Sequence, residues 1–190
     1  MLLGLIALTV FMIIKANKAV KRTNAQKEEL KQRLDRMKML KENYSDLTVE
    51  KIKSDESDLL VAGIASNIQR ELEKADDMNE AFELLSDDKK TIYALSWFLD
   101  EAKASVRGFF REYSRPLTPY VIRATELFAP KDVQKDMKRI FDIYDDENEG
   151  VSFFEDEVAE IDKRLIQTLN FDEILKNANE YVKGNAERFV

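Results

Sequence analysis

The chain has 190 residues, 44% hydrophobic and 35% charged, with three Pro and five Gly, a composition typical of a folded helical protein. It has neither Cys nor His, which excludes disulfides, thiol nucleophiles, His-dependent acid-base catalysis and His/Cys zinc sites. The net charge of −7 is unevenly divided. Residues 1–42 hold ten basic and four acidic side chains, whereas residues 43–190 hold 20 basic and 33 acidic side chains. A basic N-terminal segment is therefore followed by an acidic part of charge −13.

The N-terminal segment predicts a membrane anchor. Residues 1–14 are almost entirely apolar, and four basic residues follow between positions 15 and 22. A membrane-spanning helix needs about 20 residues, and the aliphatic stems of Lys15 and Lys18 can extend the apolar stretch to Val20. A cleaved signal peptide carries its positive charge before the apolar run, whereas here the charge follows it. We therefore predict an uncleaved transmembrane anchor over residues 1–20, with a signal peptide and a buried core helix as the alternatives.

The basic residues also predict the orientation of the anchor. Lys and Arg that directly flank a membrane span stay on the cytoplasmic side. The prediction is a single-pass protein of the cell membrane with its N-terminus outside and everything after Lys15 in the cytoplasm.

Residues 21–44 contain no Gly or Pro and predict a basic helical stalk that continues the anchor. Leu30, Leu34 and Met37 have heptad-like spacing, which leaves two alternatives. One is a homodimer through this helix, and the other is a solvated helix close to anionic lipid headgroups. Residues 45–58 are polar and are predicted to be a linker.

Residues 59–190 predict a compact multi-helix domain, because apolar residues recur there at helical spacing. The strongest helix is expected over Lys89–Arg111, with Ser86 as its N-cap. Thr118-Pro119 predicts another helix start, and Ser152–Glu155 has the form of a capping box. No alternating strand pattern or Asn-Gly turn is present. The predicted fold class is all-α, with a transmembrane helix and a helical stalk before an acidic all-helical domain.

Three stretches of this domain carry a family resemblance. They are Trp97–Glu101, Val106–Tyr113 with Gly108-Phe-Phe in its middle, and Tyr181–Phe189. Together they resemble the C-terminal domain family of bacterial DNA-mimic proteins, a helical family of mostly uncharacterised function, over about Leu59–Val190. The resemblance implies a helical module that presents carboxylates, in the manner of DNA phosphates, to a DNA-binding regulator.

The most acidic segment runs from Asp142 to Asp162 and contains no Lys or Arg. The carboxylates that we predict to face a protein partner are Asp142, Asp145, Asp146, Glu147, Glu149, Glu155 and Asp156. From Asp145 the segment approximates a calcium-binding loop, with Gly150 at the sixth position. However, position 8 is Ser152 instead of a hydrophobic residue, and position 12 is Asp156 instead of a bidentate Glu. A solvated acidic loop and an anionic docking surface are therefore the other interpretations.

A second candidate site combines Arg107 with Phe109 and Phe110. An arginine beside exposed aromatic rings could hold a carboxylate or phosphate in a bidentate grip. The alternative is an ordinary charged helix face over core aromatics, because Arg107, Arg111 and Arg115 follow at intervals of four.

No nucleophile-base pair, Gly-rich phosphate loop or metal quartet occurs in the sequence, so neither enzymatic activity nor a cofactor is predicted. We expect a membrane-anchored, cytoplasm-facing interaction protein whose acidic module binds a protein partner. One alternative is a DNA-mimic module that sequesters a DNA-binding protein, and another is a carboxylate site for calcium. Direct binding of nucleic acid is not expected, because the charge of −13 repels phosphates.

Overall fold

The computed structural model describes residues 27–190 except 29, 104, 114 and 145–150, so the predicted anchor lies outside the described residues. The chain divides into two compact units, Met1–Glu42 and Asn43–Val190. Residues 27–42 are helical where they are described, which agrees with the prediction for the stalk. Within the described part of the chain, no helix is long and apolar enough to cross a membrane.

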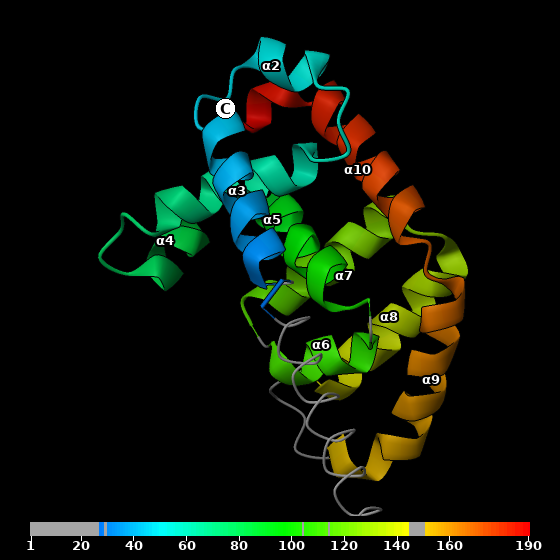
Figure 1. Ribbon diagram of the computed structural model, residues 1–190. Helices are drawn as coiled ribbons and strands as arrows, with labels where there is room; N and C mark the ends of the chain where they lie inside the picture. The colour runs from blue at the N-terminus through cyan, green and yellow to red at the C-terminus, as the bar shows by residue number, and fades with distance from the viewer. Residues whose placement is uncertain (1–26, 29, 104, 114, 145–150) are drawn as a thin grey trace, which may run out of the picture. The chain divides into compact units, whose positions relative to one another are not determined.

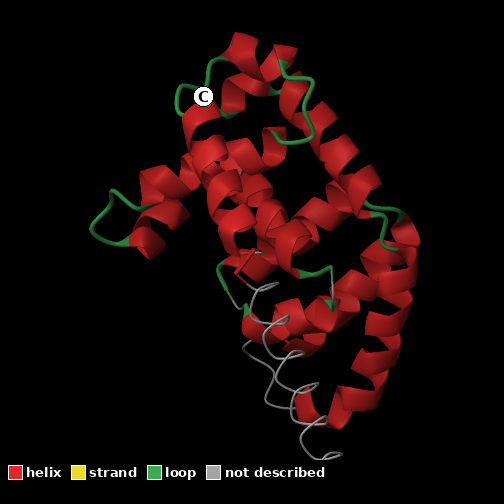
Figure 2. Cartoon of the chain, in the orientation of Figure 1, coloured by secondary structure: helices red, strands yellow, loops and turns green. Residues whose placement is uncertain are grey.

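The regular elements described in the second unit are all helices, which confirms the predicted all-α class (Figures 1 and 2). Two of them are short 3-10 helices, η1 (Val151–Phe154) and η2 (Ala186–Arg188). The α-helices are α2 (Val49–Ser54), α3 (Leu60–Leu72), α4 (Met78–Leu84), α5 (Asp87–Glu101), α6 (Val106–Glu112), α7 (Leu117–Phe128), α8 (Lys131–Tyr144), α9 (Glu155–Thr168) and α10 (Phe171–Gly184).

Helix α5 lies at the centre of this unit. It packs against α3 and α7, and α10 contacts all three of these helices. Ile92, Leu95 and Phe98 of α5 are completely buried. Helices α8 and α9 lie beside each other and pack against α6, away from α2 and the C-terminus (Figure 1).

Helix α4 projects from the rest of the unit (Figure 1) and is held by aromatic contacts of Phe82 and by the ammonium group of Lys90. Phe82 is buried, and its ring lies 5.9 Å from that of Tyr120. The Nζ of Lys90, which is also buried, donates to Glu83 at 2.8 Å and lies 5.6 and 5.3 Å from the centroids of the Phe82 and Tyr120 rings. Such cation-π contacts are strengthened when the ammonium group is desolvated, so Lys90 fastens α4 to α5.

Two predicted segments differ from the structure. The expected helix Lys89–Arg111 is two helices, because Ser105 is extended (φ −168°) and its hydroxyl accepts from Gly108 N at 2.8 Å, which begins α6. The expected linker over residues 45–58 contains α2, which packs against α10 and η2. Ile52 of α2 has no exposed surface, so this segment is part of the folded unit.

The predicted helix starts are confirmed in one case of three. Ser86 caps α5 by accepting from Lys89 N at 3.3 Å. Helix α7 begins at Leu117, so Thr118 and Pro119 occupy its first turn, where the missing amide hydrogen of proline costs no helical bond. Helix α9 begins at Glu155 after the 3-10 turn η1, and its N-cap is Phe154 with no side-chain cap, so the predicted capping box is wrong.

Near the start of the second unit, Tyr44 connects α3 with the segment that follows α2. The buried Tyr44 ring lies directly against Gly63 of α3, and its hydroxyl donates to Asp55 at 2.7 Å and lies 3.0 Å from Ser57 Oγ. Burial and the Asp55 carboxylate raise the pKa of Tyr44 to about 12, so the phenol stays protonated as a donor. Gly63 is required here because a larger residue would collide with the ring.

We expect Gly63→Ala to destabilise the protein by about 1–3 kcal/mol, the usual cost of overpacking a core. A Cβ at this position would lie only 2.3–2.5 Å from three atoms of the Tyr44 ring. Gly184→Ala is the matched control, because a Cβ there meets nothing within 4 Å. Urea denaturation followed by circular dichroism measures both; equal stabilities would show that Tyr44 does not constrain α3.

Candidate functional site

The structure describes three of the seven carboxylates that the sequence predicts to face a partner. Asp145, Asp146, Glu147 and Glu149 lie outside the described residues, and so does the first half of the calcium-like loop. Asp142 is exposed in the last turn of α8 and pairs with Lys138. Glu155 and Asp156 are exposed in the first turn of α9 and form no ion pair with a described residue. Among all the residues that the structure describes, no group of three or more carboxylates could hold a metal ion.

The acidic first turn of α9 has a structural role at the start of the helix. Glu155, Asp156 and Glu157 occupy the positive end of the helix dipole, which favours their negative charge. Only Glu157 turns toward α8, where it accepts two bonds from Arg139, at 2.7 and 2.8 Å. These bonds lower the pKa of Glu157. The carboxylates of Glu155 and Asp156 are exposed at the same end of the helix.

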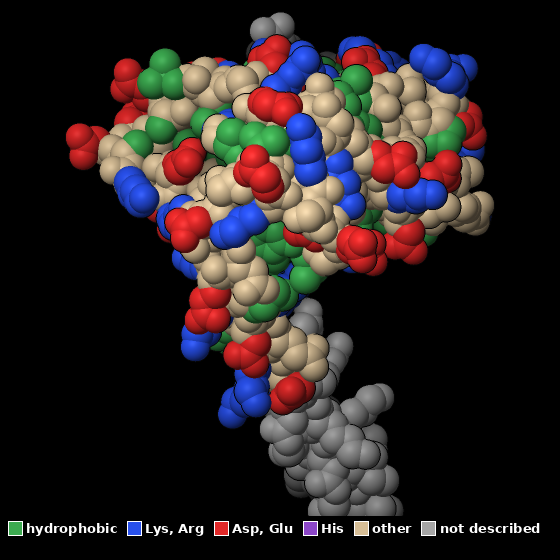
Figure 3. Space-filling view, turned by 90° about the horizontal axis from the view of Figure 1, so that it is seen from above, with side chains coloured by type: hydrophobic (Ala, Val, Ile, Leu, Met, Phe, Trp, Pro, Cys, Tyr) green, Lys and Arg blue, Asp and Glu red, His purple; other side chains and the backbone are tan. Residues whose placement is uncertain are grey.

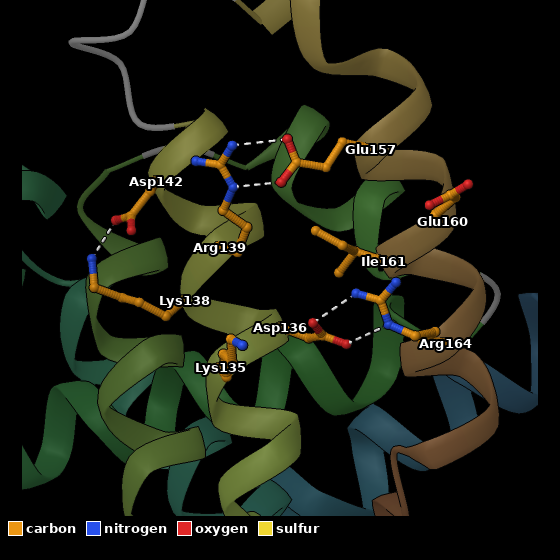
Figure 4. A pocket seen from close by; sticks show the side chains of 9 residues that line it. All are labelled: Lys135, Asp136, Lys138, Arg139, Asp142, Glu157, Glu160, Ile161 and Arg164. Carbon is orange, nitrogen blue, oxygen red and sulfur yellow. Dashed lines mark hydrogen bonds and ion pairs between the residues drawn. The ribbon is translucent and has the colours of Figure 1, made fainter.

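A shallow charged groove of about 430 Å³ separates α8 from α9 (Figure 4). Two bidentate pairs cross it in opposite senses: Arg139 of α8 binds Glu157 of α9, and Arg164 of α9 binds Asp136 of α8 at 2.8 and 3.0 Å. These side chains are partly exposed, so solvent screens their charges and each pair adds little to stability. Because their charges satisfy one another, the pairs hold the two helices together and leave no net charge for a ligand.

Asp162, the last member of the acidic segment, is used inside the fold. Its carboxylate accepts from the backbone N of Arg107 at 2.8 Å and from the Ser105 hydroxyl at 3.2 Å. Asp162 belongs to α9 but caps the N-terminus of α6, where free amide groups need an acceptor. The arrangement fastens α6 to α9 at the Gly-Phe-Phe segment.

The predicted grip of Arg107 with Phe109 and Phe110 is not formed on the surface. Phe109 and Phe110 are 2% and 4% exposed. Phe109 contacts Phe98 and Tyr113, with ring centroids 5.3 and 4.8 Å apart. The two phenylalanines lie on the face of α6 that packs inward, so in this structure they are core residues and cannot serve as exposed contacts. Arg107 itself is half-buried, and its positive charge acts on Tyr144, whose pKa is nevertheless raised by burial.

An exposed aromatic residue that the sequence prediction missed lies shortly before these exposed carboxylates in the sequence. Phe153 in η1 is 88% exposed, whereas its neighbour Phe154 covers Arg139 at 5.2 Å. The buried stripe of α9 contains Val158, Ile161 and Leu165, and the preceding Phe154 continues its spacing, so Phe153 is out of phase with the core. This difference in helical spacing is the feature of the sequence that indicates an exposed Phe153. We name Phe153, Glu155 and Asp156 the α9 tip.

Another cluster of charged side chains, centred on Asp88, connects several helices. Asp88 in the first turn of α5 accepts from Tyr181 and Arg188, each at 2.8 Å, and lies 3.9 Å from Arg123. Its partial burial opposes ionisation, but the hydrogen bonds outweigh this and lower the pKa of Asp88. Asp88 thereby joins α5, α7, α10 and η2.

Charge is mixed on the face of the molecule shown in Figure 3, where Lys and Arg side chains alternate with Asp and Glu. No continuous acidic field is visible on that face. The α9 tip differs in that two exposed carboxylates follow an exposed aromatic residue at intervals of two and three residues.

No family model, no curated protein and no solved structure matches this chain.

We expect Asp162→Ala to lower the free energy of unfolding by about 1–3 kcal/mol, because it leaves amide and hydroxyl donors at the start of α6 without their acceptor. Glu160→Ala, which removes an exposed carboxylate two residues earlier on the same helix, should change stability by less than about 0.5 kcal/mol. Chemical denaturation compares the two variants. Similar losses would mean that the α6 cap contributes little.

Proposed function

We propose that this protein is a membrane-tethered, non-enzymatic interaction protein whose acidic helical domain binds a basic protein partner on the cytoplasmic side. The single observation that supports partner binding best is the α9 tip, where an 88% exposed phenylalanine lies beside carboxylates that form no ion pair with a described residue. The tether rests on the sequence of residues 1–22 alone.

The composition of the α9 tip is typical of a protein-binding hot spot. Aromatic side chains supply much of the energy at interfaces, and a surrounding polar rim gives orientation and specificity. Phe153 would be the anchor, and Glu155 and Asp156 would attract Lys or Arg of the partner. Removing Phe153 should have little effect on folding because almost all of its surface is already in water.

The surface that presents the tip is well defined. Val158, Ile161 and Leu165 bury the opposite face of α9, and two bidentate pairs connect this helix to α8. A partner would therefore meet a preorganised surface, which reduces the entropic cost of binding.

For the tether, we expect the full chain with a C-terminal tag to sediment with membranes and the tag to resist protease added to intact cells. The basic cluster after the apolar run should keep the domain inside. Detergent must restore cleavage, as the control for tag accessibility. A soluble chain, or a tag cleaved in intact cells, contradicts the proposed tether and orientation.

For the partner surface, we expect a photo-crosslinker at position 153 of the full chain, tested in the cells that produce it, to capture a discrete protein. The same crosslinker at Leu84, which is 83% exposed on α4, is the matched control and should not capture it. Phe153→Ala should weaken binding of the captured protein by more than about 1 kcal/mol, roughly fivefold. Glu155→Gln with Asp156→Asn should weaken it further.

The competing DNA-mimic function gives a different result in the same assay. If the domain imitates nucleic acid, added duplex DNA displaces the captured protein, and binding falls steeply with salt. An aromatic-anchored contact is nearly indifferent to DNA and only moderately sensitive to salt. Capture that is equal at positions 84 and 153, or unchanged by the substitutions, contradicts the role of the α9 tip.

A further inference from the structure

The stalk helix exposes an ordered row of apolar side chains. Leu30, Leu34 and Met37 are 58%, 57% and 53% exposed, and their spacing of four and three places them side by side on one face of the helix. A single exposed leucine is ordinary on a protein surface. Three in one row are an unpartnered apolar face, which we name the stalk stripe.

Basic side chains border the stalk stripe, and acidic ones lie away from it. At about 100° per residue, Lys27, Lys31 and Lys38 follow one edge of the row. Asp35 lies farther round the same side, and Gln32 lies on the opposite face. An apolar row with lysines along its border is the arrangement of helices that lie in the interface of an anionic membrane.

The same charges argue against a second copy of the chain as the occupant of the stripe. In a parallel coiled coil, the positions that flank the stripe and face the partner helix carry Lys31, Arg33 and Lys38. These positions normally hold opposite charges that pair between helices, whereas here the charged ones are all basic and the remaining one is Leu40. A lipid surface of negative charge complements both the row and its border.

We propose that residues 27–42 form an amphipathic helix that binds the surface of an anionic bilayer, with the stalk stripe inserted at the boundary of headgroups and acyl chains. The proposal rests on the membrane tether of the proposed function, because the predicted anchor ends at Val20, shortly before this helix. It does not depend on the α9 tip or on any protein partner. Each lysine near the surface strengthens the attraction to anionic lipid.

The experiment uses the full chain, whose lack of cysteine allows a single spin label to be placed at will. Leu34→Cys labels the stripe, and Gln32→Cys labels the opposite face as the matched control. Each labelled protein is reconstituted into nanodiscs of phosphatidylcholine alone or with phosphatidylserine. Oxygen, which concentrates in the bilayer, and a water-soluble nickel chelate then report the surroundings of the label.

We expect the ratio of oxygen to nickel accessibility at position 34 to rise several-fold when phosphatidylserine is present, while position 32 stays aqueous. Met37→Cys should behave like Leu34→Cys. Replacing Lys27, Lys31 and Lys38 by Gln in the Leu34→Cys chain should abolish the rise. Circular dichroism confirms that each variant keeps its helix content.

Three results would overturn the proposal. If the chain is incorporated but the label at position 34 stays aqueous with either lipid, the stalk stripe does not bind the membrane. That result contradicts this proposal but not the tether. Spin-spin broadening at position 34 without dependence on phosphatidylserine shows that a second copy covers the stripe. A chain that never enters the bilayer fraction overturns the tether and this proposal together.

Discussion

Nearly every side chain of α5 from Lys90 to Leu99 is buried, so this helix has no face for solvent and needs neighbours on all sides. Helices α3 and α7 supply most of the contacts, and α10 contacts it as well. Its polar groups must be satisfied internally, because an unpaired buried donor costs about 1–3 kcal/mol. Thr91 therefore donates to Asp87 O at 2.6 Å, and Lys90 donates to Glu83. The positions of α3, α7 and α10 follow from the need to enclose α5.

Helix ends that face the interior are satisfied by distant side chains. Helix α3 has no side-chain cap of its own, and Val61 N donates to the buried Asn179 of α10 at 3.3 Å. Asp162 performs the corresponding function for α6. These bonds connect segments that are 118 and 55 residues apart, so they fix the positions of whole helices as well as satisfying single donors.

The sequence predicts the parts of this fold that depend on local periodicity. Leu60, Ile64, Ile68 and Leu72 predict α3 because their spacing alone defines a buried face. The break between α5 and α6 could not be found in this way, since apolar residues continue at helical spacing through Ser105. The acceptor that stabilises the break comes from α9.

Local sequence spacing also does not predict which isolated apolar residues are buried. Ile52 lies between Lys51 and Lys53 in a short, mostly polar helix, and the packing of α2 against α10 and η2 makes this helix part of the domain. In the candidate site, Phe109 and Phe153 are equally hydrophobic, yet one is 2% and the other 88% exposed. Their difference lies in which face of a helix reaches the core, and for Phe109 that is decided by the tertiary position of α6.

The two crossed arginine pairs between α8 and α9 set how far one helix can slide along the other. Moving α9 by one turn, about 5.4 Å, separates Arg139 from Glu157 and Arg164 from Asp136 at the same time. In one direction the shift also brings Glu160 toward Asp136, so that two carboxylates repel. Weak as each pair is for stability, together they select one register of the hairpin. The exposed surface at its end is thereby positioned to within a fraction of a helical turn.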